Sequence, residues 1–172
     1  CSNGQLDYTI DSWELQGSFP LQRAIPGTEN VCQERAGLSS EPLEPNEGRD
    51  GAWYDPDSPG QGFLIDAHPG NEFIFATWFT YGEGTASGQR WLTAQGPLEG
   101  STADLVLYET LVGSFDKPDP SETNAVGTMT IDFTDCSNAK LEYLITDEGL
   151  SGMIDIERAI PGTEALCEEL TQ

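Results

Sequence analysis

The chain has 172 residues, enough for one ordinary domain or for one domain and a fragment of another. Hydrophobic residues make up 37% of it, which can build a core, and no apolar run approaches the roughly 20 residues that a membrane-spanning helix needs. The net charge of -23 is spread along the chain and would repel phosphate backbones and anionic membranes, so we expect neither nucleic acid nor a membrane as partner.

The first 32 residues predict a β-hairpin that occurs twice in the chain. Residues 1–32 (CSNGQLDYTIDSWELQGSFPLQRAIPGTENVC) align without a gap to residues 136–167 (CSNAKLEYLITDEGLSGMIDIERAIPGTEALC), and 16 of the 32 positions are identical. Apolar residues alternate on both sides of a polar turn in each copy, which is the pattern of strands with one buried face. A match of this length indicates an internal duplication.

All four cysteines stand at the ends of the two copies. The pairing that treats the copies alike is Cys1–Cys32 and Cys136–Cys167, and each bond would be worth roughly 3–4 kcal/mol by closing a loop. Paired cysteines imply an oxidising compartment. A zinc site is the competing interpretation, but there is no CxxC spacing and only one histidine. Cys1 followed by serine is also typical of an acylated lipoprotein, which is the alternative for the localisation.

The segment that closes each hairpin predicts a structural role. Two arginines occupy equivalent positions in a chain with only seven basic residues, and we expect each to form a salt bridge or to cap carbonyls at the end of its hairpin. An Ile-Pro-Gly segment follows each arginine and predicts a type II turn, in which glycine accommodates a positive φ. The residues with these expected roles are Arg23, Arg158, Pro26, Gly27, Pro161 and Gly162.

The domain organisation follows from the duplication. Residues 33–50 (QERAGLSSEPLEPNEGRD) are rich in proline, glycine and charge, which predicts a linker. Residues 51–167 then form a complete β module with a tail at 168–172, whereas residues 1–32 are an orphan hairpin, the end of another module in a tandem array. Alternatively, the orphan hairpin adds its strands to a neighbouring chain or to the complete module, because an isolated hairpin is marginal in water.

Within the complete module, apolar alternation between turn residues predicts eight short strands. They are expected at 51–54, 61–68, 71–81, 89–95, 103–110, 125–134, 139–146 and 150–158. Strands joined at hairpin length predict an all-β fold, an antiparallel meander that either closes as a small β-barrel or folds as a sandwich. The duplicated N-terminal hairpin is additional to these eight strands.

Four short motifs carry a resemblance to a known class of proteins. They are GAWYDPDSPGQGF at 51–63, WFTY at 78–81, GQRW at 88–91 and FTDC at 133–136. Together they resemble an uncharacterised class of secreted bacterial β modules, although GQRW is one residue short and Ala139 replaces a glycine of that pattern. The resemblance implies secretion or a place on a bacterial cell surface and modules arranged in series, but no named reaction. The first hairpin, GAWY to FLIDA, also resembles that of avidin-type barrels, which implies a fold only.

Five aromatic residues are candidates for a ligand site. Exposed rings would stack on sugars, whereas buried rings would fill a small barrel, and alternation places at least half of them inside. The candidates are Trp53, Tyr54, Trp78, Tyr81 and Trp91.

A weak calcium-loop pattern lies in DPDSPGQGFLID. Asp55, Asp57 and Asp66 fall at positions one, three and twelve of the template, with glycine at six. Proline at five, aspartate rather than glutamate at twelve and strand-like flanks depart from it. An ordinary proline-glycine turn is therefore favoured, with structural calcium as the alternative and no other cofactor expected.

The sequence contains no nucleophile elbow, phosphate loop or dinucleotide fingerprint, so we expect no enzyme. The first hypothesis is an extracellular structural or adhesive module that associates in series or self-assembles, as a filament or surface array, through its duplicated hairpin. Its partners would be copies of itself or adjacent modules of the same chain. The alternative is a module that binds a glycan or another small ligand through exposed tryptophan and tyrosine.

Overall fold

The structure is a computed structural model that describes residues 1–23, 29, 32–33, 36–37, 47–68, 72–82, 88–115, 117 and 119–170. The chain divides into two compact units, Cys1–Leu43 and Glu44–Gln172. Each unit is described by itself.

The first unit contains the predicted N-terminal hairpin. Strand β1 (Asn3–Ile10), the 3-10 helix η1 (Asp11–Trp13) and strand β2 (Leu15–Gln22) form a two-stranded antiparallel sheet. Tyr8 lies opposite Gly17 and its ring occupies the space that a side chain at Gly17 would fill. The predicted Cys1–Cys32 disulfide is present. Four apolar side chains of this hairpin stay between 38% and 42% exposed; they are Leu6, Leu15, Phe19 and Leu21.

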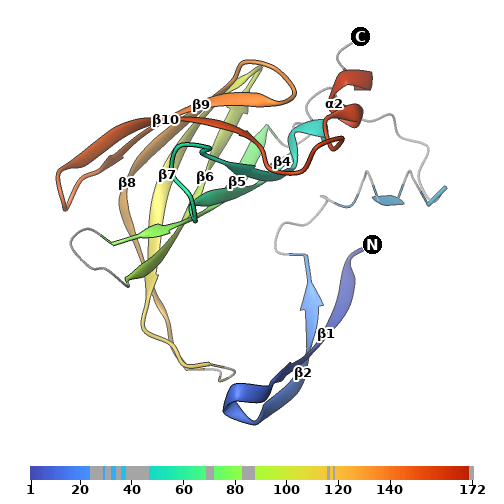
Figure 1. Cartoon of the computed structure of the whole chain (residues 1–172), viewed down its shortest axis with the longest axis vertical. Helices are drawn as coiled ribbons and strands as arrows, with labels where there is room; N and C mark the ends of the chain where they lie inside the picture. Colours follow the sequence, from blue (N-terminus) through green and yellow to red (C-terminus); the bar gives the residue numbers. More distant parts are fainter. Residues whose placement is uncertain are drawn as a thin grey trace. The chain divides into compact units, whose positions relative to one another are not determined.

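The second unit is a closed eight-stranded barrel (Figure 1). Its strands are β3 (Gly51–Tyr54), β4 (Gly62–His68), β5 (Phe73–Tyr81), β6 (Gln89–Glu99), β7 (Thr102–Leu111), β8 (Glu122–Phe133), β9 (Asn138–Ile145) and β10 (Leu150–Arg158). Each strand pairs antiparallel with the next, and β10 pairs with β3. The helix η2 (Glu47–Arg49) precedes the barrel and helix α2 (Ala165–Leu170) follows it. The structure therefore confirms the barrel and not the sandwich.

The meander gives the barrel two different ends, because alternate loops of an antiparallel barrel lie at opposite ends. The last residues of β3, β5, β7 and β9 lie at one end, which we call the mouth. The last residues of β4, β6 and β8, together with η2 and α2, lie at the other end, which we call the base. Figure 1 shows β7 and β8 continuing as a hairpin beyond the strands beside them.

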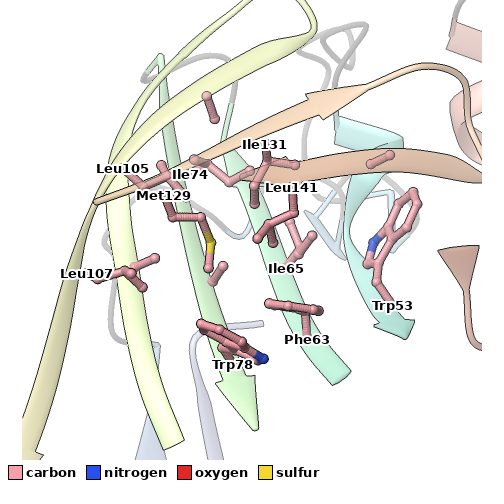
Figure 2. Close-up of a cluster of buried hydrophobic side chains, with 14 of the residues drawn as sticks. Trp53, Phe63, Ile65, Ile74, Trp78, Leu105, Leu107, Met129, Ile131 and Leu141 are labelled. Atoms are coloured by element: carbon pink, nitrogen blue, oxygen red, sulfur yellow. The ribbon is translucent and has the colours of Figure 1, made fainter. Parts of the chain in front are cut away.

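The barrel interior is filled by the inward side chains of all eight strands. Figure 2 shows many of these side chains, which point from the strands into one cluster. The largest fully buried members are Trp53, Ile74, Leu92, Leu107, Met129, Ile131, Leu141 and Ile156, none of them more than 1% exposed. In β9 and β10 the alternating residues Leu141, Ile145 and Ile156 are buried, as alternation predicts.

Two arginines and two aromatic rings close the base. The rings of Trp53 and Phe133 meet edge to face with centroids 5.6 Å apart. The guanidinium of Arg158 lies 4.8 Å from the Trp53 ring centroid and that of Arg49 lies 4.8 Å from the Phe133 centroid. Cation–π contacts of this kind strengthen as water is excluded. Burial lowers the pKa of both arginines, but the ordinary pKa of arginine is so high that both stay charged at neutral pH.

Arg158 of β10 also binds two other segments, residues 48–50 and the turn at Cys136, through three carbonyl groups. Its Nε donates to the carbonyl of Cys136 at 2.5 Å, Nη1 donates to that of Asp50 at 2.9 Å, and Nη2 donates to that of Gly48. In the first unit, Arg23 Nε donates to the carbonyl of Cys1 at 3.0 Å, which is the equivalent of the Cys136 bond. Both arginines therefore cap carbonyls, one of the two roles expected from the sequence.

Both copies contain the predicted disulfide, and the second copy also contains the predicted turn. Gly162 has a φ of 84°, as the third position of a type II turn requires, and Pro161 precedes it. The Cys136–Cys167 disulfide joins the start of β9 to α2. The equivalent Pro26–Gly27 turn of the first copy lies outside the described residues.

The C-terminal end of the predicted linker and the first residues of the predicted tail belong to the barrel unit in the structure. Residues 44–50 belong to the barrel unit, because Gly48 is buried against the backbone of Cys167 and accepts the Arg158 hydrogen bond. Residues 168–170 are helical as part of α2. A polar segment such as EGRD is typical of a linker, and only its contacts with a distant arginine and cysteine reveal that it is part of the fold.

Asp135 gives the barrel a pH-dependent contribution at the turn between β8 and β9. Its Oδ1 accepts from the backbone N–H of Ser137 at 2.7 Å and of Asn138 at 2.8 Å. The Ser137 bond above all holds the pKa of Asp135 below its ordinary 3.8. A carboxyl whose pKa falls on folding stabilises the folded state above its unfolded pKa, and the effect is lost as the pH drops through the lower folded pKa.

We therefore expect Asp135→Asn to destabilise the barrel by about 1 kcal/mol at pH 7. The difference from the wild type should shrink as the pH falls below 3.8, the ordinary pKa of this carboxyl. Urea unfolding of both proteins between pH 7 and pH 2 measures it. Asp155→Asn is the control, because its carboxylate is 86% exposed and 3.8 Å from Lys140, and its effect should stay small throughout. A difference for Asp135→Asn that is constant with pH would contradict the prediction.

Candidate functional site

The mouth of the barrel opens into a cavity of about 360 Å³, which we call the mouth cavity. Its apolar lining comes mainly from Phe63, Trp78, Tyr143, Ile145, Leu150 and Ile154. Its polar lining comes from Asp55, Ser58, Gln61, Thr80, Tyr81 and Arg90. Sites for small molecules are usually apolar concavities of a few hundred Å³ with a few polar groups, and eight-stranded barrels can hold one small ligand.

Three aromatic rings form the inner wall of the mouth cavity. The rings of Phe63 and Trp78 stack with centroids 5.5 Å apart, and Tyr143 meets Trp78 at 4.9 Å with its ring tilted. Figure 2 shows the first two rings lying together, away from Trp53. Gly152 lies opposite Tyr143 and leaves room for the tyrosine ring, as Gly17 does for Tyr8 in the first hairpin. The rings therefore form one continuous aromatic part of the cavity lining.

Trp78 has a buried hydrogen-bond donor in this wall. The residue is 5% exposed, and its indole Nε1–H has no hydrogen-bond partner among the described residues. A buried donor without an acceptor costs roughly 1–3 kcal/mol, so most such groups in native proteins are satisfied by protein, water or ligand. Trp78 thus combines an unmatched donor with a place in the lining of the mouth cavity.

Arg90 is the one basic residue among those that line the mouth cavity, and two carboxylates hold it. Its Nε lies 2.8 Å from Glu109 Oε1, and its Nη2 lies 2.7 Å from Glu148 Oε1. Burial opposes the charge of Arg90, but the hydrogen bonds to Glu109 and Glu148 outweigh burial and raise its pKa. The arginine thus fixes the turn between β9 and β10 against β6 and β7.

The charges around the mouth favour a neutral or cationic ligand. Arg90 contributes one positive charge, whereas Glu109, Glu148 and Asp55 contribute three negative charges. The whole chain adds a net charge of -23. An anionic ligand would be repelled both during approach and in the cavity.

The structure separates the five predicted aromatic candidates. Trp53 and Trp78 are buried at 1% and 5% exposure, and the hydroxyl of Tyr54 donates to Glu157 at 2.7 Å across the β3–β10 pair. Tyr81 and Trp91 are exposed, at 47% and 49%. Only Trp78 and Tyr81 line the mouth cavity.

A second aromatic surface lies on the outside of the barrel. Phe79 is 45% exposed and pairs directly with Trp91, and Tyr81 follows on the same face of β5. These three residues border a shallow hollow of about 320 Å³, and we call them the outer aromatic surface. Sequence reasoning did not include Phe79, although its alternation with Tyr81 in WFTY and the nearby QRW carried the signal.

Three of the motifs that carry the resemblance meet at the mouth. Gln61 of the first motif accepts a hydrogen bond from the Thr80 hydroxyl of WFTY, and Gly60 lies directly beneath the Tyr81 hydroxyl. Arg90 of GQRW lines the same cavity. Sequence reasoning missed Gln61, Thr80, Arg90 and Tyr143 as site residues, because only closure of the barrel brings β4, β5, β6 and β9 around one space.

The three aspartates of the calcium-loop pattern do not come together. Asp55 Oδ1 accepts from the backbone N–H of Asp57 at 2.8 Å in the loop after β3. Asp66 lies within β4 and its Oδ1 is 2.8 Å from His68 Nε2. No group of three acidic, histidine or cysteine side chains in the described part of the chain could hold a metal ion.

Comparisons with known proteins assign no family to the chain. No protein-family model, no curated protein and no solved structure matches it. The described helices include none that is long and apolar enough to cross a membrane. Both disulfides indicate an oxidising compartment, and Cys1 takes part in one of them.

Proposed function

We propose that the barrel is a non-enzymatic extracellular module that binds one small, neutral, ring-containing molecule in its mouth cavity. The observation that carries this proposal is the buried indole N–H of Trp78, which has no partner among the described residues and belongs to a residue that lines the cavity beside Phe63 and Tyr143. The ring of the ligand would lie against these aromatic side chains. A hydrogen-bond acceptor on the ligand would receive the indole proton, and the negative mouth would select against carboxylates and phosphates.

The test uses two probes of the same shape and different charge. Benzamide offers a ring and a carbonyl acceptor, whereas benzoate has the same ring and a negative charge. The chain has four tryptophans, whose indole N–H signals are resolved by ¹⁵N-correlated NMR and assigned with tryptophan-to-phenylalanine variants. We expect benzamide at millimolar concentration to move the Trp78 signal and to leave the Trp53 signal in place, and benzoate to act at least several-fold more weakly. No shift of Trp78 with either probe, or an equal response to both, would contradict the proposal.

Filling the cavity should abolish this response without unfolding the barrel. Ile154→Phe adds an aromatic ring to the cavity wall and introduces the residue found at the equivalent position, Phe19, of the first hairpin. Leu144→Phe is the matched control, because Leu144 is 46% exposed on the outside of β9. We expect the benzamide response to fall at least tenfold in Ile154→Phe and to persist in Leu144→Phe. Urea unfolding of both variants checks that they remain folded.

A second candidate function is glycan binding on the outer aromatic surface. The specific observation is the exposed trio Phe79, Tyr81 and Trp91, since exposed aromatic rings stack on sugar faces. The NMR measurement separates the two candidates, because chitotriose bound there would move the indole signal of Trp91 and not that of Trp78. A Trp91→Ala variant should then lose the response.

A further inference from the structure

The hairpin β1–β2 presents to solvent the same apolar face that its duplicate buries inside the barrel. Leu6 is 40% exposed, whereas the equivalent Leu141 is 0% exposed. Leu21 is 42% exposed, whereas the equivalent Ile156 is 1% exposed. A hairpin with one apolar face is marginally stable in water and needs a surface that covers this face.

We propose that β1–β2 is the last hairpin of a second barrel, and that its partner is an unclosed six-stranded unit built like residues 44–135. Such a unit consists of a short 3-10 turn followed by six antiparallel strands equivalent to β3–β8. The hairpin would pair with the first and last of these strands, as β10 pairs with β3 and β9 pairs with β8. This inference is independent of the ligand proposed above.

The backbone geometry of the two hairpins agrees residue for residue. β1 and β2 pair from Asn3↔Gln22 to Ile10↔Leu15, and β9 and β10 pair at the equivalent positions, from Asn138↔Glu157 to Ile145↔Leu150. The same register places the same side chains on the buried face, since a slip of one residue would reverse the faces. The first hairpin is therefore already in the register that closes a barrel.

The disulfide and the arginine that hold the base of the barrel also occur in the first hairpin. Each hairpin carries a disulfide between equivalent cysteines and an arginine that donates from Nε to the carbonyl of the first cysteine. In the barrel, the remaining guanidinium nitrogens of Arg158 bond to Gly48 and Asp50, just before β3.

The positions at which the hairpins differ do not oppose the fit. Gln5 and Pro20 replace Lys140 and Asp155, an exposed pair whose charged atoms are 3.8 Å apart on the outside of the barrel. Phe19 replaces Ile154, which borders the open mouth cavity, where a larger side chain has space. The fully buried Leu141 has the same residue, Leu6, at its equivalent position.

A second copy of this chain does not offer the required strands. Its β3 and β8 are already paired with its own β10 and β9, which are covalently attached to them. An unattached hairpin would have to displace these strands against a large effective concentration. The partner is therefore a unit without a closing hairpin of its own.

The decisive experiment transplants the first hairpin into the known barrel. In the full chain, residues 136–145 and 150–167 are replaced by the sequence of residues 1–10 and 15–32, and the turn at 146–149 is kept. Sixteen positions differ between the copies and four of these lie in the turn, so the chimera carries twelve substitutions. We expect it to unfold in urea in one cooperative transition and to keep the slow amide exchange of β8 and the folded Trp53 indole signal. Loss of all three would overturn the proposal.

Two control chimeras show whether the apolar face closes the barrel. One is built from a hairpin carrying Leu6→Asp, which places a charge on the buried face, and the other from a hairpin carrying Gln5→Asp, on the solvent face. The first should fail to form the barrel and the second should match the parent chimera. If the parent chimera fails because of overpacking, a version carrying Phe19→Ile restores the volume of Ile154, and its failure as well would overturn the proposal. Equal folding of both control chimeras would also overturn it.

The unmodified chain tests whether a second copy of the chain, rather than a separate six-stranded unit, covers the apolar face of β1–β2. Sedimentation at increasing concentration should show no association that depends on the hairpin. A dimer or polymer that Leu6→Asp abolishes and Gln5→Asp preserves would assign the face to a second copy of the chain, and would overturn the assignment to a separate six-stranded unit.

Discussion

Replacing Arg158 by alanine is expected to lower the free energy of unfolding of the barrel by about 3–5 kcal/mol. The change removes the donor from three carbonyl groups, those of Gly48, Asp50 and Cys136. It also removes the cation above the Trp53 ring, and the residue itself is only 8% exposed. Water cannot replace so many contacts at a buried site without opening the base of the barrel.

Thermal unfolding followed by near-ultraviolet circular dichroism measures this effect, and we expect the Tm to fall by roughly 10–20 °C. The duplication provides the control, because Arg23→Ala removes the equivalent arginine from the first unit and should leave the Tm of the barrel unchanged. Arg158→Lys should be intermediate, since an ammonium group cannot present donors in three fixed directions. A Tm for Arg158→Ala within 3 °C of the wild type would show that the contacts of Arg158 are not important for stability.

Removing the disulfide of the barrel is expected to have the second largest effect. Cys136→Ser together with Cys167→Ser should lower the free energy of unfolding by about 3–4 kcal/mol, because the reduced chain has a larger entropy when unfolded. Cys167 is 1% exposed and its backbone packs on Gly48, so α2 and η2 should also separate in the variant. The loss therefore combines an effect on the unfolded chain with one on the folded base.

Urea unfolding of this variant is compared with that of Cys1→Ser together with Cys32→Ser, which opens the equivalent bond of the first unit. The barrel transition should move only in the first of the two variants. Because the disulfide and Arg158 hold the same 3-10 helix, combining their removal should cost less than the sum of the single changes. Full additivity would show that the two devices act independently.

The sequence predicts the strands of this protein better than it predicts their ends. All eight barrel strands follow from alternation, but residues 96–99 have the composition of a turn and form the end of β6. Gly96 lies so close to the carbonyl of Asp104 that no side chain would fit there, and Pro97 points outward and is exposed. Glycine and proline usually mark turns in a sequence. Here Gly96 and Pro97 lie in a strand that closely approaches its neighbour, and only the tertiary structure determines this approach.

The candidate site was predictable only in part, for a related reason. Trp78 and Tyr81 stand out as aromatic residues in a motif, but alternation alone assigns Trp78 to the core. Its importance depends on the space beside it and on Tyr143 and Arg90, which come from strands far apart in the sequence. The local pattern determines which side of a strand faces inward, whereas the position of a cavity along the barrel axis depends on how the strands are staggered.

The contact between η2 and α2 means that the polypeptide enters and leaves the barrel at one pole, opposite the mouth. In a protein that carried several such units, each barrel would be attached to the connecting chain only at its base, and its mouth would face away from the connecting segments. A pulling force along the connecting chain would act between residues 47 and 167. The hydrogen bonds of Arg158 and the Cys136–Cys167 disulfide would resist this force. The hydrogen bonds between the strands around the cavity would not be stretched.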